Sequence, residues 1–133
     1  MKYYTIAEFV RSSTADKHGI NNRCKKEHVE RITKLVDNVL DPLREWYGKP
    51  INITSGYRCP ELNAILPGAS KTSQHMKGMA ADISVGSKAE NKKLFDYIKD
   101  NLPFDQLINE SDFSWVHVSY VSEPANRKEV KKL

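Results

Sequence analysis

The stretch Ser73-Gln74-His75-Met76-Lys77-Gly78-Met79-Ala80-Ala81-Asp82 places an imidazole and a carboxylate seven positions apart. The chain has only four histidines, and another of them lies in the strand-like stretch Trp115-Val116-His117-Val118-Ser119. Two neutral imidazoles and one carboxylate form a ligand set that suits zinc and leaves a fourth coordination position open. The sequence therefore predicts a zinc site built from His75, Asp82 and His117.

Strand alternation predicts how these side chains meet. From Ala80 to Val85, alternation places Asp82 on a face of small and polar residues, with apolar residues on the opposite face. The same rule places His117 opposite its valine neighbours. Two neighbouring strands would present Asp82 and His117 to a shared cleft, and His75 would enter from the loop before the first strand, where Gly78 supplies backbone freedom. A single histidine or aspartate near a strand is usually structural or solvated, but the joint pattern favours the metal site of a hydrolase.

The motif Ser73-x-His75-x-x-Gly78-x-Ala80-x-Asp82, followed by Trp115-x-His117, resembles the signature of the zinc D-Ala-D-Ala carboxypeptidase family. That family also contains the L-alanyl-D-glutamate endopeptidases of phage lysis systems, and the hedgehog signalling domain is a fold relative. The resemblance includes the upstream element Ile53-Thr54-Ser55-Gly56-Tyr57-Arg58 and extends from Thr5 to Val121. It implies that His75, Asp82 and His117 hold one Zn²⁺ per chain.

The same resemblance implies residues for substrate binding. Arg58 follows a predicted strand, and the family pattern assigns its position to a substrate carboxylate, which the planar guanidinium fork matches in a bidentate way. We expect Ser73 and Gln74 to bind substrate or to hold His75 in orientation through hydrogen bonds.

Hydrolysis also requires a general base beside the metal. Many members of the family carry an acidic residue three positions before the last histidine ligand, whereas this chain has Ser114 there. We expect Glu110 to be the base, because it ends a strand that is predicted to pair with the strand of His117. Asp112 is the second candidate, and a zinc-binding relative without catalysis is the third alternative.

Length and composition are those of an ordinary soluble domain. The chain has 133 residues, of which 39% are hydrophobic and 29% charged, and we expect residues 1–133 to form one domain with a basic, disordered tail at 122–133. No apolar run is long enough to span a bilayer, and the amino terminus lacks the apolar core of a secretory signal. We therefore expect no membrane insertion, synthesis in the cytoplasm, and action on the cell wall after release or export by another route.

Charge and cysteine content argue against other classes of site. Part of the net charge of +4 lies in the tail rather than in a patch interleaved with aromatic residues, so we expect no nucleic-acid partner. The spacing of Cys24 and Cys59 matches no metal-binding motif, and we expect free thiols. The chain is expected to be a monomer.

Local patterns predict an α+β fold, in which a small, mainly antiparallel sheet carries the zinc site and packs against helices, as in hedgehog and D-Ala-D-Ala peptidase domains. A capping box at Thr5 predicts a short helix to Ser12, followed by an irregular connection over 13–23. Apolar residues at helical spacing predict a main core helix from Glu27 to Gly48, kinked or broken near Pro42. Further expected elements are a strand at 51–54, a short helix from Pro60, a helix from Ser87 to Asn101, and strands at 80–85, 104–110 and 115–120, the last two joined by a hairpin connection at 111–114.

Together these features predict a zinc-dependent peptidase acting on peptidoglycan stem peptides, either removing a terminal D-Ala or cutting the bond between L-Ala and D-Glu. A phage lysis enzyme is one form that this activity takes in the family. The alternative function is a catalytically inactive, zinc-containing binding module of the same fold, which would keep the three ligands and need no base.

Overall fold

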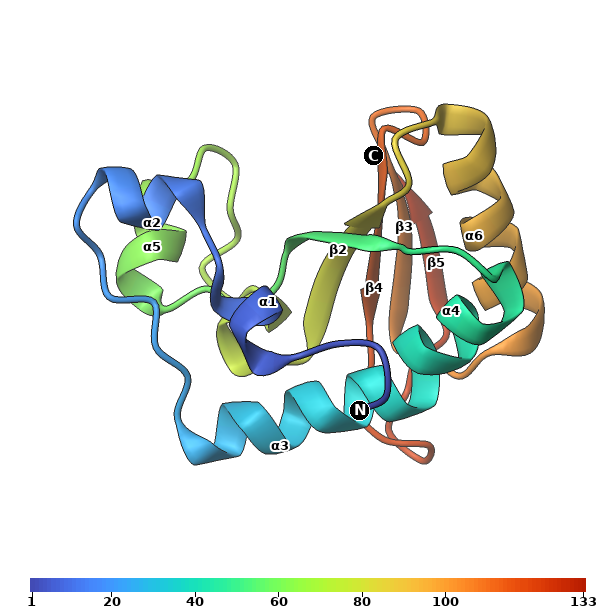
Figure 1. Cartoon of the computed structure of the whole chain (residues 1–133), viewed down its shortest axis with the longest axis horizontal. Coiled ribbons are helices and arrows are strands. Elements are labelled where there is room, and N and C mark those ends of the chain that lie inside the picture. Colours follow the sequence, from blue (N-terminus) through green and yellow to red (C-terminus); the bar gives the residue numbers. More distant parts are fainter.

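A five-stranded sheet organises the computed structural model, which describes residues 1–133. The strands stand in the order β1-β2-β4-β3-β5 (Figure 1). Neighbouring strands are antiparallel except for β3 and β5, which are parallel, so the predicted mainly antiparallel α+β class is confirmed. The strands span Asn52–Ser55 (β1), Ala80–Ser84 (β2), Gln106–Glu110 (β3), Trp115–Ser119 (β4) and Glu129–Lys132 (β5).

Alternation of side chains along the strands gives the sheet two different faces. The apolar face packs against the helices, and its fully buried positions are Ala81, Ile83, Leu107, Val116 and Val118. The opposite face carries a row of direct cross-strand partners: Asp82 of β2, His117 of β4, Ile108 of β3 and Lys131 of β5. Two of the predicted zinc ligands are therefore immediate neighbours on adjacent strands, about 5 Å apart at their Cα atoms.

The main core segment continues through Pro42 without a break. It consists of α3 (Lys26–Leu35), a π-helical turn η1 (Val36–Leu40) and α4 (Asp41–Tyr47). In the π-turn the Asp41 N–H donates to the Val36 carbonyl, five residues back instead of four. This extra residue accommodates Pro42, which has no N–H and would clash with the carbonyl of a regular preceding turn. The π-turn thus takes the place of the predicted kink, and Gly48 ends α4 in the left-handed conformation, as expected.

The amino-terminal segment forms two short helices. The predicted capping box is confirmed in α1 (Ile6–Val10), where Thr5 and Glu8 exchange side-chain and backbone hydrogen bonds. The prediction of an irregular connection over 13–23 is wrong for its first part, because α2 occupies Ser13–Lys17. The hydroxyl of Ser12 accepts from the Ala15 N–H and supplies the N-cap that starts this helix.

The carboxy-terminal segment contains the strand β5, in the stretch for which the sequence predicted a disordered tail. β5 lies beside β3 in parallel register, with Gln106 opposite Glu129 and Ile108 opposite Lys131. The Leu133 N–H donates to the Asn109 carbonyl at 2.8 Å. Backbone pairing to an inner strand, rather than burial of apolar side chains, holds this segment, which explains why its polar composition did not predict a strand.

The remaining helices surround the site and the core. They are α5 (Pro60–Ile65), the 3₁₀-helix η2 (Gln74–Lys77) and α6 (Lys88–Asn101), which the Ser87 hydroxyl caps as predicted. In Figure 1, α3 runs along the bottom of the molecule, α4 and α6 lie at the right, and α2 and α5 form a separate group at the upper left. No helix is both long and apolar enough to cross a membrane. Cys24 and Cys59 form no disulfide.

Candidate metal centre

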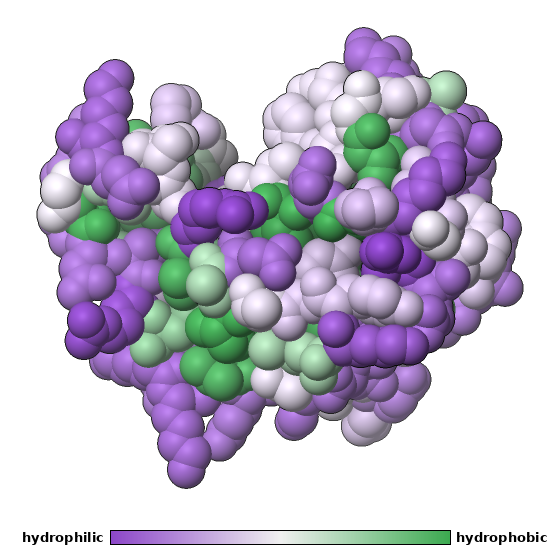
Figure 2. Space-filling view, viewed as in Figure 1, coloured by the Kyte–Doolittle hydropathy of each residue, from purple (hydrophilic) through white to green (hydrophobic).

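The cleft between the α2–α5 group and the end of the sheet contains the predicted zinc ligands. The cleft has a volume of about 830 Å³, and Figure 2 shows it as a notch between two lobes of the surface. Its walls come from the 66–74 segment on one side and from β3, β4 and β5 on the other. His75, Asp82 and His117 lie at its base and are almost completely buried.

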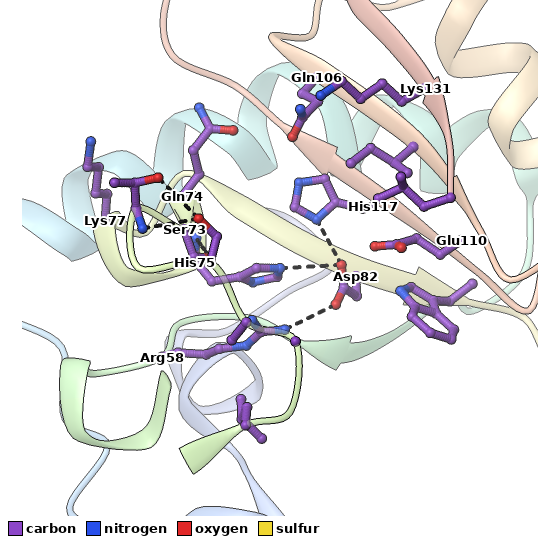
Figure 3. Close-up of a pocket in the computed structure, with 18 of the residues that line it drawn as sticks. Arg58, Ser73, Gln74, His75, Lys77, Asp82, Gln106, Glu110, His117 and Lys131 are labelled. Carbon is purple, nitrogen blue, oxygen red and sulfur yellow. Dashed lines mark hydrogen bonds and ion pairs between the residues drawn. The ribbon is translucent and has the colours of Figure 1, made fainter. Parts of the chain in front are cut away.

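The three side chains converge on one point, as Figure 3 shows. His75 Nε2 lies 3.3 Å from Asp82 Oδ1, and His117 Nδ1 lies 3.0 Å from the same oxygen. One possible ligand atom from each residue lies within 4.8 Å of the others. Two atoms bound to a common tetrahedral zinc at 2.0–2.1 Å are about 3.3 Å apart. The two distances from Asp82 Oδ1 are therefore close to those within a zinc ligand set.

The hydrogen bond of His75 provides an independent test of this fit. His75 Nδ1 lies 2.7 Å from the carbonyl oxygen of Gly56, and a carbonyl can only accept. Nδ1 must therefore carry the proton, so Nε2 of the neutral ring presents a lone pair to the Asp82 carboxylate. Two acceptors at this distance repel each other unless a positive charge lies between them, which either a metal ion or a second ring proton supplies. The residues present fit a metal ion, and a carbonyl behind a ligating histidine is the usual means of fixing its tautomer.

His117 has a different environment from His75. Its Nε2 is buried and has no hydrogen-bond partner, so the contact with Asp82 is the only polar contact of the ring. Burial by itself raises the pKa of Asp82, but the neighbouring His75 and His117 outweigh it and hold the pKa below its usual range. The carboxylate thus stays ionised, as a metal ligand must be.

The loop that carries His75 is held at both ends. The Ser73 hydroxyl accepts from the His75 N–H, and the Gln74 side-chain amide donates to Asp105 at 2.9 Å. Gly78 ends η2 with φ +77°, and a Cβ there would lie 2.8 Å from the His28 carbonyl. The predicted need for backbone freedom at Gly78 is confirmed, because both the conformation and the close approach exclude a side chain.

Arg58 lies next to the ligand set. Its Nη2 is 3.4 Å from Asp82 Oδ2, its Nε donates to the Ser55 hydroxyl at 3.0 Å, and its backbone N–H donates to the His75 carbonyl. Nη1 makes no hydrogen bond within the chain. Burial lowers the pKa of the guanidinium and the negative charge of Asp82 opposes this effect. The guanidinium of Arg58, next to the proposed zinc ligands, therefore has one nitrogen, Nη1, free to bind another group.

The two candidate bases lie in different places. Glu110 lines the cleft at the end of β3, and its carboxylate points towards Asp82 in Figure 3. Burial raises the pKa of Glu110, and the charge of Asp82 raises it further. Asp112, in contrast, lies in the hairpin turn with a side chain that is 79% exposed and 3.8 Å from the ammonium of Lys88. The fold therefore brings Glu110, and not Asp112, to the ligand set.

The sequence analysis did not predict that several residues of the carboxy-terminal segment line the cleft. Lys131 and Leu133 line the wall because β5 joins the sheet, and Arg127 reaches the cleft from the segment before it. Their placement depends on the pairing of distant segments, which no local periodicity reports.

The peptidase M15 family model matches residues 2–119, which include all three predicted zinc ligands. The chain belongs to the peptidase M15 family. A comparison with curated proteins gave no match. M15 peptidases are zinc-dependent, and the buried His75, Asp82 and His117 can hold one metal ion, so the predicted family, cofactor and zinc metallopeptidase class are confirmed.

Proposed function

We propose that this M15 member is a zinc peptidase that cleaves peptidoglycan stem peptides, with His75, Asp82 and His117 as the metal ligands. The observation that carries the proposal is the placement of a carboxylate, Glu110, and a guanidinium, Arg58, in the same cleft as the ligand set. A purely structural zinc site is closed by four protein ligands. Three ligands at the base of an open cleft instead leave room for a water and a substrate.

Glu110 takes the role of general base in this proposal. When bound, zinc supplies a Lewis acid for the scissile carbonyl and lowers the pKa of a neighbouring water. The Glu110 carboxylate accepts the proton of the attacking water and returns it to the leaving amine. Its raised pKa supports this role, because a carboxyl group with a pKa closer to neutrality returns a proton more readily. The position of Glu110 in the cleft also favours catalysis over an inactive binding module.

Arg58 binds the carboxylate of the residue that follows the scissile bond. Both proposed bonds provide one there: a terminal D-Ala ends in a carboxylate, and the D-Glu of stem peptides keeps its α-carboxylate free because it continues the chain through its side chain. Arg58 has a free Nη1, and its Nη2 lies 3.4 Å from Asp82 Oδ2; both features support recognition of such a group beside the metal. Ser73 and Gln74 also line the cleft, and in this proposal they contact the peptide backbone of the substrate.

Product analysis tests this function and separates its forms. The zinc-loaded chain is incubated with purified peptidoglycan and with a stem peptide ending in D-Ala-D-Ala, and products are identified by mass spectrometry. Released D-Ala identifies a carboxypeptidase, and cleavage between L-Ala and D-Glu identifies an endopeptidase. Loss of turbidity of a cell-wall suspension would support a lysis role. A zinc-loaded chain that releases no product from either substrate, at any protein concentration, refutes the proposal and returns the chain to the binding-module alternative.

A further inference from the structure

Asp105 is a buried carboxylate outside the ligand set. It precedes β3, and its side chain is only 2% exposed. A buried ionised group is costly unless its acceptor sites are filled by hydrogen bonds. Asp105 meets this requirement through Arg127, whose Nε and Nη2 donate at 3.1 and 2.7 Å and whose backbone N–H donates at 2.9 Å. The guanidinium thus holds the pKa of Asp105 at about 2.

The carboxylate also has a partner in the metal-site loop. Gln74 donates its side-chain amide to Asp105 Oδ2 at 2.9 Å. The carbonyl of Gln74 accepts from the Met79 N–H, so this residue is bound at both its side chain and its backbone. Gln74 directly precedes His75 in η2. A shift of Gln74 therefore moves the backbone that carries a metal ligand.

The backbone of Asp105 ties the same carboxy-terminal segment to the sheet. The Glu129 N–H donates to the Asp105 carbonyl at 2.9 Å, at the start of β5. Asp105 thus contacts the segment through both side chain and main chain, and contacts the His75 loop through Gln74. Arg127 lies beyond residue 119, where the family match ends.

We propose that Arg127 is a positioning residue of the metal centre, which acts through Asp105 and Gln74 to set the place of His75. The proposal rests on the proposed function only in its use of His75 as a zinc ligand. Outer contacts that orient ligating side chains contribute about 10- to 100-fold to metal affinity. Removing the guanidinium leaves the Asp105 carboxylate buried and short of donors, and the Gln74 amide is the remaining side-chain donor that can move to compensate.

The test measures metal binding of full-length variants, so it does not depend on an active substrate. Zinc affinity is determined by competition with a chromophoric chelator, and ligand geometry is read from the visible spectrum of the Co²⁺-substituted protein. We expect Arg127→Gln to weaken zinc affinity about tenfold and to change the Co²⁺ spectrum. The zinc affinity of Arg127→Lys should lie between those of Arg127→Gln and the wild type, because an ammonium keeps the charge but cannot donate in the bidentate way of a guanidinium. Lys128→Gln is the matched control, since Lys128 is an exposed neighbour whose side chain makes no hydrogen bond or ion pair, and it should keep the wild-type affinity.

The link through Gln74 gives a second test that does not require removal of the ion pair. Gln74→Ala should weaken zinc binding to a similar extent, and adding Arg127→Gln should weaken it little further, because coupled residues are not additive. The proposal is overturned if Gln74→Ala keeps the wild-type zinc affinity and Co²⁺ spectrum. It is also overturned if Arg127→Gln folds with a lowered melting temperature but keeps both properties. Arg127 and Asp105 would then have a purely structural role. Absence of zinc binding in the wild type would instead refute the ligand assignment itself.

Discussion

Replacement of Asp105 by asparagine tests whether its buried carboxylate stabilises the fold. Asparagine keeps the shape but removes the charge, and its amide then places a donor where Arg127 and Gln74 also donate. The pKa of Asp105 falls from an ordinary 3.8 to about 2, mainly because of the hydrogen bonds from Arg127. Each pKa unit corresponds to about 1.4 kcal/mol, which gives about 2.5 kcal/mol in favour of the ionised form. Arg127 is 55% exposed and solvent screens part of this attraction, so we expect a loss of about 1.5 kcal/mol.

The pH dependence has a definite sign. Because folding lowers the pKa of Asp105, the stabilisation is fully present above the unfolded pKa of about 3.8 and is lost as the pH falls through the folded value. The difference in unfolding free energy between wild type and Asp105→Asn should therefore be constant from about pH 7 to 5 and should shrink below about pH 4.

Urea unfolding of the zinc-free proteins, followed by tryptophan fluorescence at several pH values, measures this difference. Zinc is removed from both proteins so that its release in acid does not contribute. Asp100→Asn is the control, because Asp100 is exposed and its side chain makes no hydrogen bond or ion pair. A difference below about 0.5 kcal/mol at pH 7, which is ordinary for a surface substitution, or one that does not change in acid, would refute the reasoning.

Three further predictions concern the metal and the reaction. Alanine at any one of the three proposed ligands should abolish tight zinc binding, measured by metal analysis after dialysis, and full zinc content in any two of these variants would contradict the ligand set. Arg58→Lys should lower turnover while zinc content and melting temperature stay close to wild type, and unchanged kinetics on every active substrate would leave Arg58 as a charge without a substrate role. Glu110→Gln should retain zinc yet lose about a hundredfold or more in rate, whereas Asp112→Asn should have little effect; the reverse result would move the base to Asp112.

The predictions that succeeded from sequence depend on local physical chemistry. Period-two alternation placed Asp82 and His117 on one face, and the structure makes them direct partners on β2 and β4. The capping box at Thr5 and the hydroxyl cap at Ser87 each involve residues three positions apart, so both could be located from the sequence alone. Gly78 could be identified because a ligand-bearing loop must turn back into a strand.

The predictions that failed involve preferences that the rest of the fold overrides. The 13–17 segment is polar, yet the Ser12 cap and burial of Ala15 make it helical. Pro42 would break an isolated helix, but packing of the core on both sides of it favours a π-turn over a break. The first failure missed the local cap at Ser12, and in the second the local preference of Pro42 was outweighed by core packing.

The chemistry of the metal site could be predicted from local sequence: which side chains can bind zinc, on which strand faces they lie, and which family motif they form. The choice between the two carboxylates stayed open at the level of sequence, although Glu110 was the first candidate. The two residues differ by two positions, and strand pairing places Glu110 in the cleft and Asp112 in solvent. Tertiary structure also decided that the carboxy-terminal segment becomes β5 and that Arg127 reaches Asp105. The physical reason is that a parallel edge strand and a buried ion pair both depend on groups more than twenty residues apart, whose contact leaves no periodic trace in either segment.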